Sequence, residues 1–172
     1  MTDKIEEIIE TIRSLRAKVI LEGKDALSVA FKDFFASTPG VKSVFWDQYT
    51  PYFNDGDECV FHVHEMHVEL DESLLAEDAQ KFLERNNLSG RRDYEQLDAL
   101  QSITDRRSWY KYDDIERTSL NAQETAIIEN FSKLENKLNH SELHEMFKFV
   151  FGDHVTVIAT PDEIVTEECE HD

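Results

Sequence analysis

Residues 46–59 have the sequence Trp46-Asp-Gln-Tyr-Thr-Pro-Tyr-Phe-Asn-Asp-Gly-Asp-Glu-Cys59 and lie between two strand-like stretches, Val41–Trp46 and Cys59–Leu70. Asp55-Gly56 is typical of a hairpin turn, because glycine adopts positive φ angles without steric cost. We therefore expect the two stretches to form a β-hairpin whose connection is an aromatic-rich loop. The change of period at this segment, from helical before it to alternating around it, decides the fold class.

The segments on either side of the hairpin have the periodicity of amphipathic helices. Met1–Glu22 repeats isoleucine, leucine and valine at helical spacing, and Gly23 is expected to end this N-terminal helix. Asp25–Ser37 favours a second helix, stopped by Pro39-Gly40. Further helices are expected over Leu70–Asn87, over Asp93–Asp105, from Ser119 or Asn121 to about Leu138, and over Ser141–Phe151, where Gly152 ends the last one.

The end of the chain predicts a second hairpin over residues 154–169. His154–Thr160 and Ile164–Cys169 alternate with period two around Pro161-Asp162. Because an isolated hairpin is marginally stable in water, the two hairpins are expected to share one sheet. The sequence thus predicts a single α+β domain over residues 1–172, with an antiparallel sheet of about four strands and helices packed on one face.

Charge limits the partners that the chain can bind. It has 37 acidic and 18 basic residues and a net charge of −19. Nucleic acids and anionic membranes would be repelled, so we expect no direct binding to either and a protein partner with a basic surface instead.

No stretch reaches the ~20 apolar residues of a membrane span. No signal peptide is recognisable, so the expected location is the cytoplasm. Cys59 and Cys169 are expected to be reduced there, with a disulfide between them as the alternative.

Basic residues alternate with aromatic ones between residues 85 and 117, around Trp109, Tyr110 and Tyr112. This composition can bind nucleic acid through phosphate contacts and stacking. Ion pairs with neighbouring acidic helices are the interpretation that we favour, because the chain as a whole is strongly acidic.

The spacing of His62 and His64 on a predicted strand places both side chains on the same face, because side chains alternate along a strand. His-x-His is a spacing that strand-borne metal sites use, so a metal-binding protein or enzyme with a divalent metal at these residues is an alternative to a chain without cofactors. His67 falls on the opposite face unless a bulge intervenes. The simpler interpretation is a pair of hydrogen-bonded or hydrated histidines, because no second metal motif follows. The chain also lacks a nucleophile or phosphate-binding motif, so we assign no catalytic residue and expect a protein that is not an enzyme.

The aromatic loop contains the candidate binding residues. Exposed aromatic side chains dominate the energy of protein interfaces. The alternative is that the same rings fill the core beside the turn. The candidates are four aromatic anchors and two acidic residues at their rim: Trp46, Tyr49, Tyr52, Phe53, Asp55 and Asp57. A further alternative is a self-associating structural protein, a homo-oligomer in which the Met1–Glu22 helix pairs between copies.

The pattern Trp46-x-Gln-Tyr-Thr-Pro-Tyr-Phe-Asn-Asp-Gly-Asp-x-Cys59-x-Phe61-x-Val63 resembles that of an uncharacterised family of small acidic proteins from bacteria and tailed phages. The acidic end of the chain also resembles the tail of that family, and the resemblance covers about residues 25–172. It implies a fold signature or a binding groove. The phage members imply an inhibitor of a host enzyme or defence system, acting in the host cytoplasm. The net negative charge extends this expectation to a host nucleic-acid-handling or defence protein that is bound through a negatively charged surface.

Overall fold

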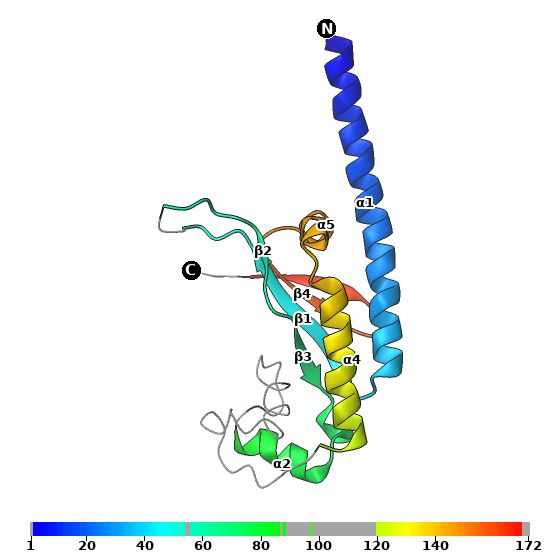
Figure 1. Ribbon diagram of the computed structural model, residues 1–172, viewed down its shortest axis with the longest axis vertical. Coiled ribbons are helices and arrows are strands. Elements are labelled where there is room, and N and C mark those ends of the chain that lie inside the picture. Colours follow the sequence, from blue (N-terminus) through cyan, green and yellow to red (C-terminus); the bar gives the residue numbers. More distant parts are fainter. Residues whose placement is uncertain (1, 54–55, 87, 89–96, 98–119, 170–172) are drawn as a thin grey trace.

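A computed structural model of the chain describes residues 2–53, 56–86, 88, 97 and 120–169. Helix α1 (Thr2–Ser37) has 36 residues, and its first half extends beyond the rest of the molecule (Figure 1). The helix predicted for residues 93–105 and most of the basic segment 85–117 lie outside the described residues. The other elements are β1 (Val41–Tyr49), β2 (His62–Val63), β3 (His67–Leu70), the 3₁₀ turn η1 (Glu72–Leu74), α2 (Glu77–Arg85), α4 (Ala122–Leu138), α5 (Ser141–Phe151), β4 (Val155–Ala159) and β5 (Ile164–Glu168).

The two predicted hairpins share one antiparallel sheet. The strand order is β2-β1-β4-β5, and β3 pairs with β1 on the same side as β2. The β1–β4 pairing, with Val44 opposite Ala159 and Gln48 opposite Val155, joins the two ends of the chain. The prediction of an α+β fold with an antiparallel sheet is therefore confirmed.

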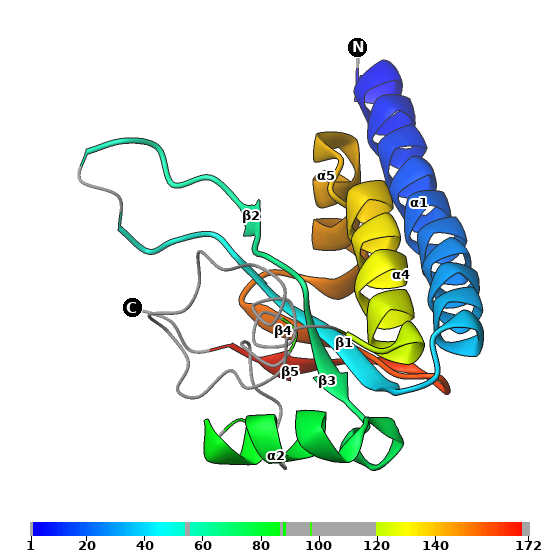
Figure 2. The same cartoon turned by 60° about the horizontal axis from the view of Figure 1, so that its bottom comes forward.

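Helices α1, α4 and α5 lie together against one face of the sheet, whereas α2 lies near the end of β3 (Figure 2). Trp46 is at the centre of this face, with its ring centroid 6.0 Å from that of Phe31 on α1 and 5.6 Å from that of Phe147 on α5. Phe45 and Ile158, which point to the opposite face, are also buried. The central strands β1 and β4 are thus covered on both faces, which explains the unbroken apolar run Val157-Ile158-Ala159.

The prediction that Gly23 ends the first helix is wrong, because α1 continues through it to Ser37. Gly23 is buried against α5. A Cβ atom at this position would lie 2.8 Å from Met146 Sδ and 3.2 Å from Val150 Cγ2. Glycine therefore allows the two helices to approach closely, and this tertiary contact outweighs its low helix propensity of about 1 kcal/mol relative to alanine. The predicted stop at Pro39-Gly40 is confirmed, with Gly40 at φ +104°.

Two other predicted elements are divided in the structure. The strand predicted over Cys59–Leu70 pairs only at β2 and β3. The helix predicted over Leu70–Asn87 becomes η1 and α2, because the Asp71 side chain accepts a hydrogen bond from the Ser73 amide and caps the 3₁₀ turn instead. The predicted Asn121 cap of α4 is confirmed as a capping box with Glu124, and Gly152 ends α5 as expected.

Candidate functional site

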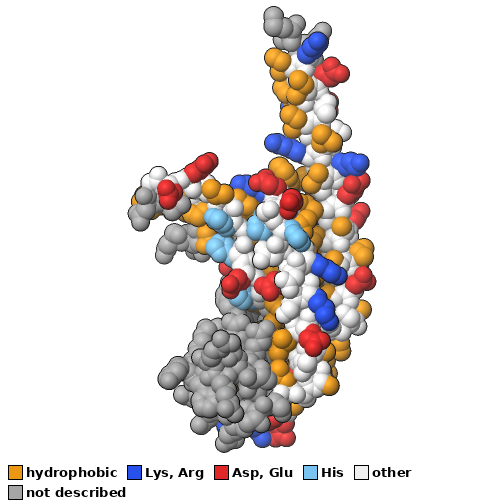
Figure 3. All heavy atoms as spheres, in the orientation of Figure 1, with side chains coloured by type: hydrophobic (Ala, Val, Ile, Leu, Met, Phe, Trp, Pro, Cys, Tyr) orange, Lys and Arg blue, Asp and Glu red, His pale blue; other side chains and the backbone are white. Residues whose placement is uncertain are grey.

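The loop between β1 and β2, residues 50–61, projects from the edge of the sheet (Figures 1 and 2). Tyr52 and Phe53 are 72% and 78% exposed, and Val60, near the other end of the loop in sequence, is 53% exposed. Asp57 and Glu58 are exposed as well. Figure 3 shows acidic side chains next to hydrophobic ones at the end of this loop. The β1–β2 loop thus presents apolar rings together with negative charge.

Thr50 fixes the first end of the loop to the turn between α5 and β4. Its amide N–H and its hydroxyl donate hydrogen bonds to Oδ1 and Oδ2 of Asp153, each 2.7 Å long. Lys148 Nζ lies 3.2 Å from the same carboxylate. Partial burial raises the pKa of Asp153, but the hydrogen bonds from Thr50 and the nearby Lys148 outweigh it and hold this pKa at about 2. The carboxylate is therefore ionised at neutral pH, and the contact is a charge-assisted one.

The second end of the loop is held by the same lysine. Lys148 Nζ lies over the Phe61 ring, 4.8 Å from its centroid, and also donates a hydrogen bond to Thr50 Oγ1. Tyr52 stacks on His154 with ring centroids 4.8 Å apart. His154 has φ 58°, a left-handed conformation that turns the chain directly after Asp153. The loop is therefore tied at its first end to the α5–β4 turn and at its second end to Lys148 in the last turns of α5.

Trp46 and Gln48 connect β1 to the end of α5 inside the core, beneath the base of the loop. Both are completely buried, and the indole N–H of Trp46 donates a hydrogen bond to Gln48 Oε1. Gln48 Nε2 in turn donates to the carbonyl oxygens of Phe147 (3.2 Å) and Gly152 (2.6 Å). Trp46 is thus a core residue and cannot be a contact residue, because no partner could reach it in the folded chain.

The other predicted anchors occupy different environments. Tyr49 is partly buried and stacks on His64, with ring centroids 4.4 Å apart. Asp55 lies outside the described residues, and Asp57 is exposed in the loop. The structure therefore leaves Tyr52, Phe53 and Asp57 as the exposed members of the predicted set.

The predicted histidine pair lies on the sheet face opposite the helices. His62 is opposite Tyr49 and His67 is opposite Phe45 in the sheet. His64 stacks on Tyr49, so the irregular connection between β2 and β3 brings His62, His64 and His67 to the same face. Among the residues that the structure describes, no three histidine, cysteine or acidic side chains are grouped to hold a metal ion. A metal site at His62 and His64 thus gains no support from the described residues.

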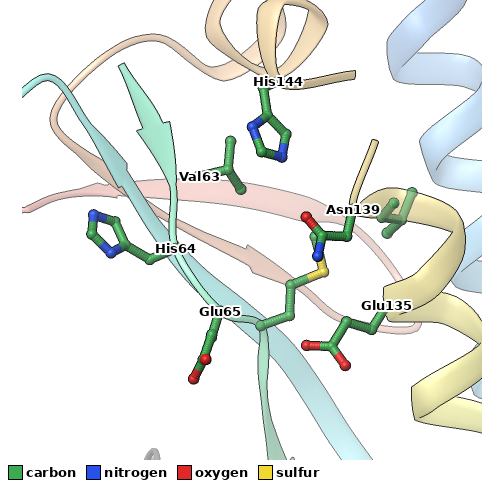
Figure 4. Close-up of a pocket in the computed structure, with 8 residues that line it drawn as sticks. Val63, His64, Glu65, Glu135, Asn139 and His144 are labelled. Carbon is green, nitrogen blue, oxygen red and sulfur yellow. The ribbon is translucent and has the colours of Figure 1, made fainter. Parts of the chain in front are cut away.

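A small pocket of about 90 Å³ lies between the β2–β3 connection and the junction of α4 and α5. Figure 4 shows the side chains of Glu135, Asn139 and His144 around it, while the ring of His64 points away to the other side of the strand. His64 and His144 therefore do not converge on a common ligand position.

Cys59 and Cys169 are both free thiols, so the alternative of a disulfide between them is not seen. Burial and the negative charge of Asp47 raise the pKa of the Cys169 thiol. The thiol is protonated at neutral pH and is a poor nucleophile.

Comparison of the chain with protein-family models, with curated proteins and with solved structures finds no match. No helix in the described part of the chain is long and apolar enough to cross a membrane. Sequence reasoning missed Gln48, Thr50, Lys148 and Asp153, which form the base of the loop. Their contacts join positions about 100 residues apart, and no local pattern marks them.

Proposed function

We propose that this chain is a non-enzymatic binding protein that docks its β1–β2 loop onto a basic protein surface containing an apolar pocket. The observation that carries the proposal is the exposure of Tyr52 and Phe53, 72% and 78%, on a loop whose two ends are fixed to α5 and to the turn that follows it. Large apolar rings held in water in this way are typical of interface anchors.

The fixed base of the loop supports a binding role. Association costs free energy for every group that must be ordered, so a loop that is already held in place loses less on binding. Thr50 and Phe61 are both tied through Lys148, and Tyr52 is stacked on His154. The rings are therefore presented by a supported loop.

The charge of the loop indicates the chemistry of the partner. Residues 50–61 contain Asp55, Asp57 and Glu58 and no basic residue, within a chain of net charge −19. A basic rim around the partner's pocket would be attracted at long range and would exclude acidic competitors. Proteins that bind nucleic acids carry such surfaces. The most specific form of the proposal is a phage protein that acts in the host cytoplasm and inhibits a host nucleic-acid-handling or defence protein. The resemblance of residues 46–63 to a family with phage members supports this form.

The test compares three immobilised full-length proteins in a bacterial lysate: the natural chain, the double variant Tyr52→Ala/Phe53→Ala and the control Leu74→Ala. Leu74 is 49% exposed on η1, so the control truncates an exposed apolar side chain elsewhere. We expect one basic protein to be captured by the natural chain and by the control and to be lost with the double variant. All three proteins should unfold cooperatively at similar temperatures, because neither ring belongs to the core and the double variant loses only the stacking of Tyr52 on His154.

The purified partner then allows the charge to be tested. Asp57→Asn/Glu58→Gln should slow association and reduce its dependence on salt, whereas Tyr52→Ala/Phe53→Ala should mainly speed dissociation. Capture that is equally strong with all variants, or no specific capture by the natural chain, would contradict the proposal.

A further inference from the structure

The first half of α1 forms an arm, residues 4–22, that projects from the body of the protein and is mostly exposed within the described part of the chain (Figure 1). Its aliphatic side chains are 41–60% exposed along one side: Ile5, Ile8, Ile9, Ile12, Leu15 and Val19. Figure 3 shows hydrophobic side chains in a stripe along this arm. Branched aliphatic side chains are strongly stabilised by burial, so a continuous stripe of them in water indicates an interaction surface.

The body of the protein covers α1 only from the end of the arm. The Arg16 guanidinium lies over the Phe149 ring of α5, 5.4 Å from its centroid, and Gly23 lies against Met146, whose Sδ would be 2.8 Å from a Cβ atom at residue 23. Beyond Gly23, Leu27 and Phe31 enter the core. The arm is thus the continuation of a helix whose second half is firmly anchored, which fixes the direction in which its stripe faces.

The spacing of the stripe is that of a coiled coil. Five apolar residues follow one another at intervals of three, four, three and four, which places Ile5, Ile12 and Val19 at a positions and Ile8 and Leu15 at d positions of a heptad. This spacing matches a second helix that runs alongside. The apolar repeat is interrupted at Glu22, which occupies the next d position. Ala26 and Val29, at the a and d positions that follow, line a groove of about 400 Å³ between α1 and α4.

The charge of the chain indicates that the helix which covers the stripe belongs to a second copy of this chain. The chain carries −19, so two copies repel each other almost everywhere. The arm carries no net charge, because its four bases and four acids cancel: Lys4, Arg13, Arg16 and Lys18 against Glu6, Glu7, Glu10 and Glu22. Two arms can therefore approach without net repulsion, and the acidic bodies need not come into contact for the apolar stripes to be buried.

The residues that flank the stripe favour a parallel pair. In a parallel coiled coil, a g position meets the e position five residues later on the other helix. Lys4 then meets Ile9 of the second copy and Thr11 meets Arg16, so no like charges are opposed. In an antiparallel pair centred on Ile12, Lys4 would lie beside Lys18 of the second copy. We propose that the arms of two copies of this chain pair in parallel and in register through the stripe from Ile5 to Val19.

The first test is the mass in solution at tens of micromolar protein. The natural chain should have at least twice the 20.1 kDa of the single chain. Ile12→Glu places a charge in the centre of the stripe and should lower the mass to that of the single chain. The matched control is Leu21→Glu, because Leu21 is 65% exposed but lies on the opposite side of α1 and should leave the assembly intact. A single-chain mass for the natural protein, or equal effects of the two variants, would overturn the proposal.

The second test is cross-linking through a single cysteine in a chain in which Cys59 and Cys169 are replaced by serine. Ile5→Cys should form a disulfide between copies under mild oxidation, since residue 5 meets itself only in a parallel pair in register. Leu21→Cys should not. Absence of the Ile5→Cys product, or an equal yield at residue 21, would overturn the proposal. So would a single-chain protein that co-sediments with vesicles of zwitterionic or anionic lipid, because the arm would then be a membrane-surface helix.

Discussion

Thr50 donates two hydrogen bonds to Asp153 across 103 residues of sequence, one from its amide nitrogen and one from its hydroxyl, each 2.7 Å long. The pair joins the start of the β1–β2 loop to the turn that follows α5. Both oxygens of the carboxylate are used, so the orientation of the Thr50 backbone is fixed as well as its position. The exposed rings of Tyr52 and Phe53 follow directly in the chain, and their placement depends on this pair.

We predict that Asp153→Asn reduces the free energy of unfolding by about 2 kcal/mol at pH 6, since the pKa of Asp153 is held at about 2 against an ordinary 3.8. A carboxyl whose pKa is lower in the folded state stabilises the protein above its ordinary pKa, and this contribution disappears as the pH falls through the folded-state value. The difference between the natural chain and the variant should therefore shrink between about pH 4 and pH 2. Urea unfolding at a series of pH values measures it, and a difference that is independent of pH would show that the carboxylate charge is not involved.

Gln48→Leu should reduce the free energy of unfolding by about 1–3 kcal/mol, because it removes the acceptor of the buried Trp46 indole N–H without leaving a large cavity. Part of this loss should disappear in a Trp46→Phe background, which has no indole N–H to satisfy. Urea unfolding of the two single variants and the double variant measures the coupling. Strictly additive losses would mean that the hydrogen bond between the two side chains contributes nothing.

The sequence predicts elements where the signal is local, and the structure confirms them. The Asn121 capping box, Gly152 at the end of α5 and the alternation of the C-terminal hairpin each depend on residues within one turn or one strand. Phe31 and Trp46 follow the periodicity of their own elements into the core. The antiparallel α+β fold follows from such signals, because the two hairpins require a common sheet.

The sequence does not predict features that depend on distant contacts. Thr50 has no local reason to bond to Asp153, and Gln48 has none to bond to Gly152. The strand predicted over Cys59–Leu70 is interrupted between β2 and β3, where the side chain of Met66 is buried in the core. Aromatic composition marks the β1–β2 loop, but it cannot separate the buried Trp46 from the exposed Phe53 seven residues later.

Gly23 is a further example and leads to a third prediction. Gly23→Leu should destabilise the protein by about 1–3 kcal/mol, because the added side chain would collide with Met146 and Val150 on α5. Ala17→Leu, on an exposed part of the same helix, should be close to neutral. Urea unfolding at equal protein concentration measures both. Combining Gly23→Ala with Met146→Ala should be less harmful than the sum of the single changes, since the shortened Met146 makes room for the new Cβ atom.

Thiol labelling gives the fourth prediction. Cys169 should react with an alkylating reagent more slowly in the folded protein than in the unfolded one at pH 8, because burial and the Asp47 charge raise its pKa and disfavour the thiolate that reacts. The measurement uses Cys59→Ser, so that Cys169 is the only thiol, and mass spectrometry follows the modified fraction over time. Asp47→Asn in the same background removes the negative charge and should speed the labelling. That change also removes the acceptor of the Thr156 hydroxyl, so Thr156→Val is measured beside it. Thr156→Val in addition removes a hydrogen bond between Thr156 and Cys169 that lowers the pKa of the thiol, so this variant should slow the labelling. A faster reaction with Thr156→Val but not with Asp47→Asn would assign the protection of Cys169 to the packing of β4 against β5 rather than to charge.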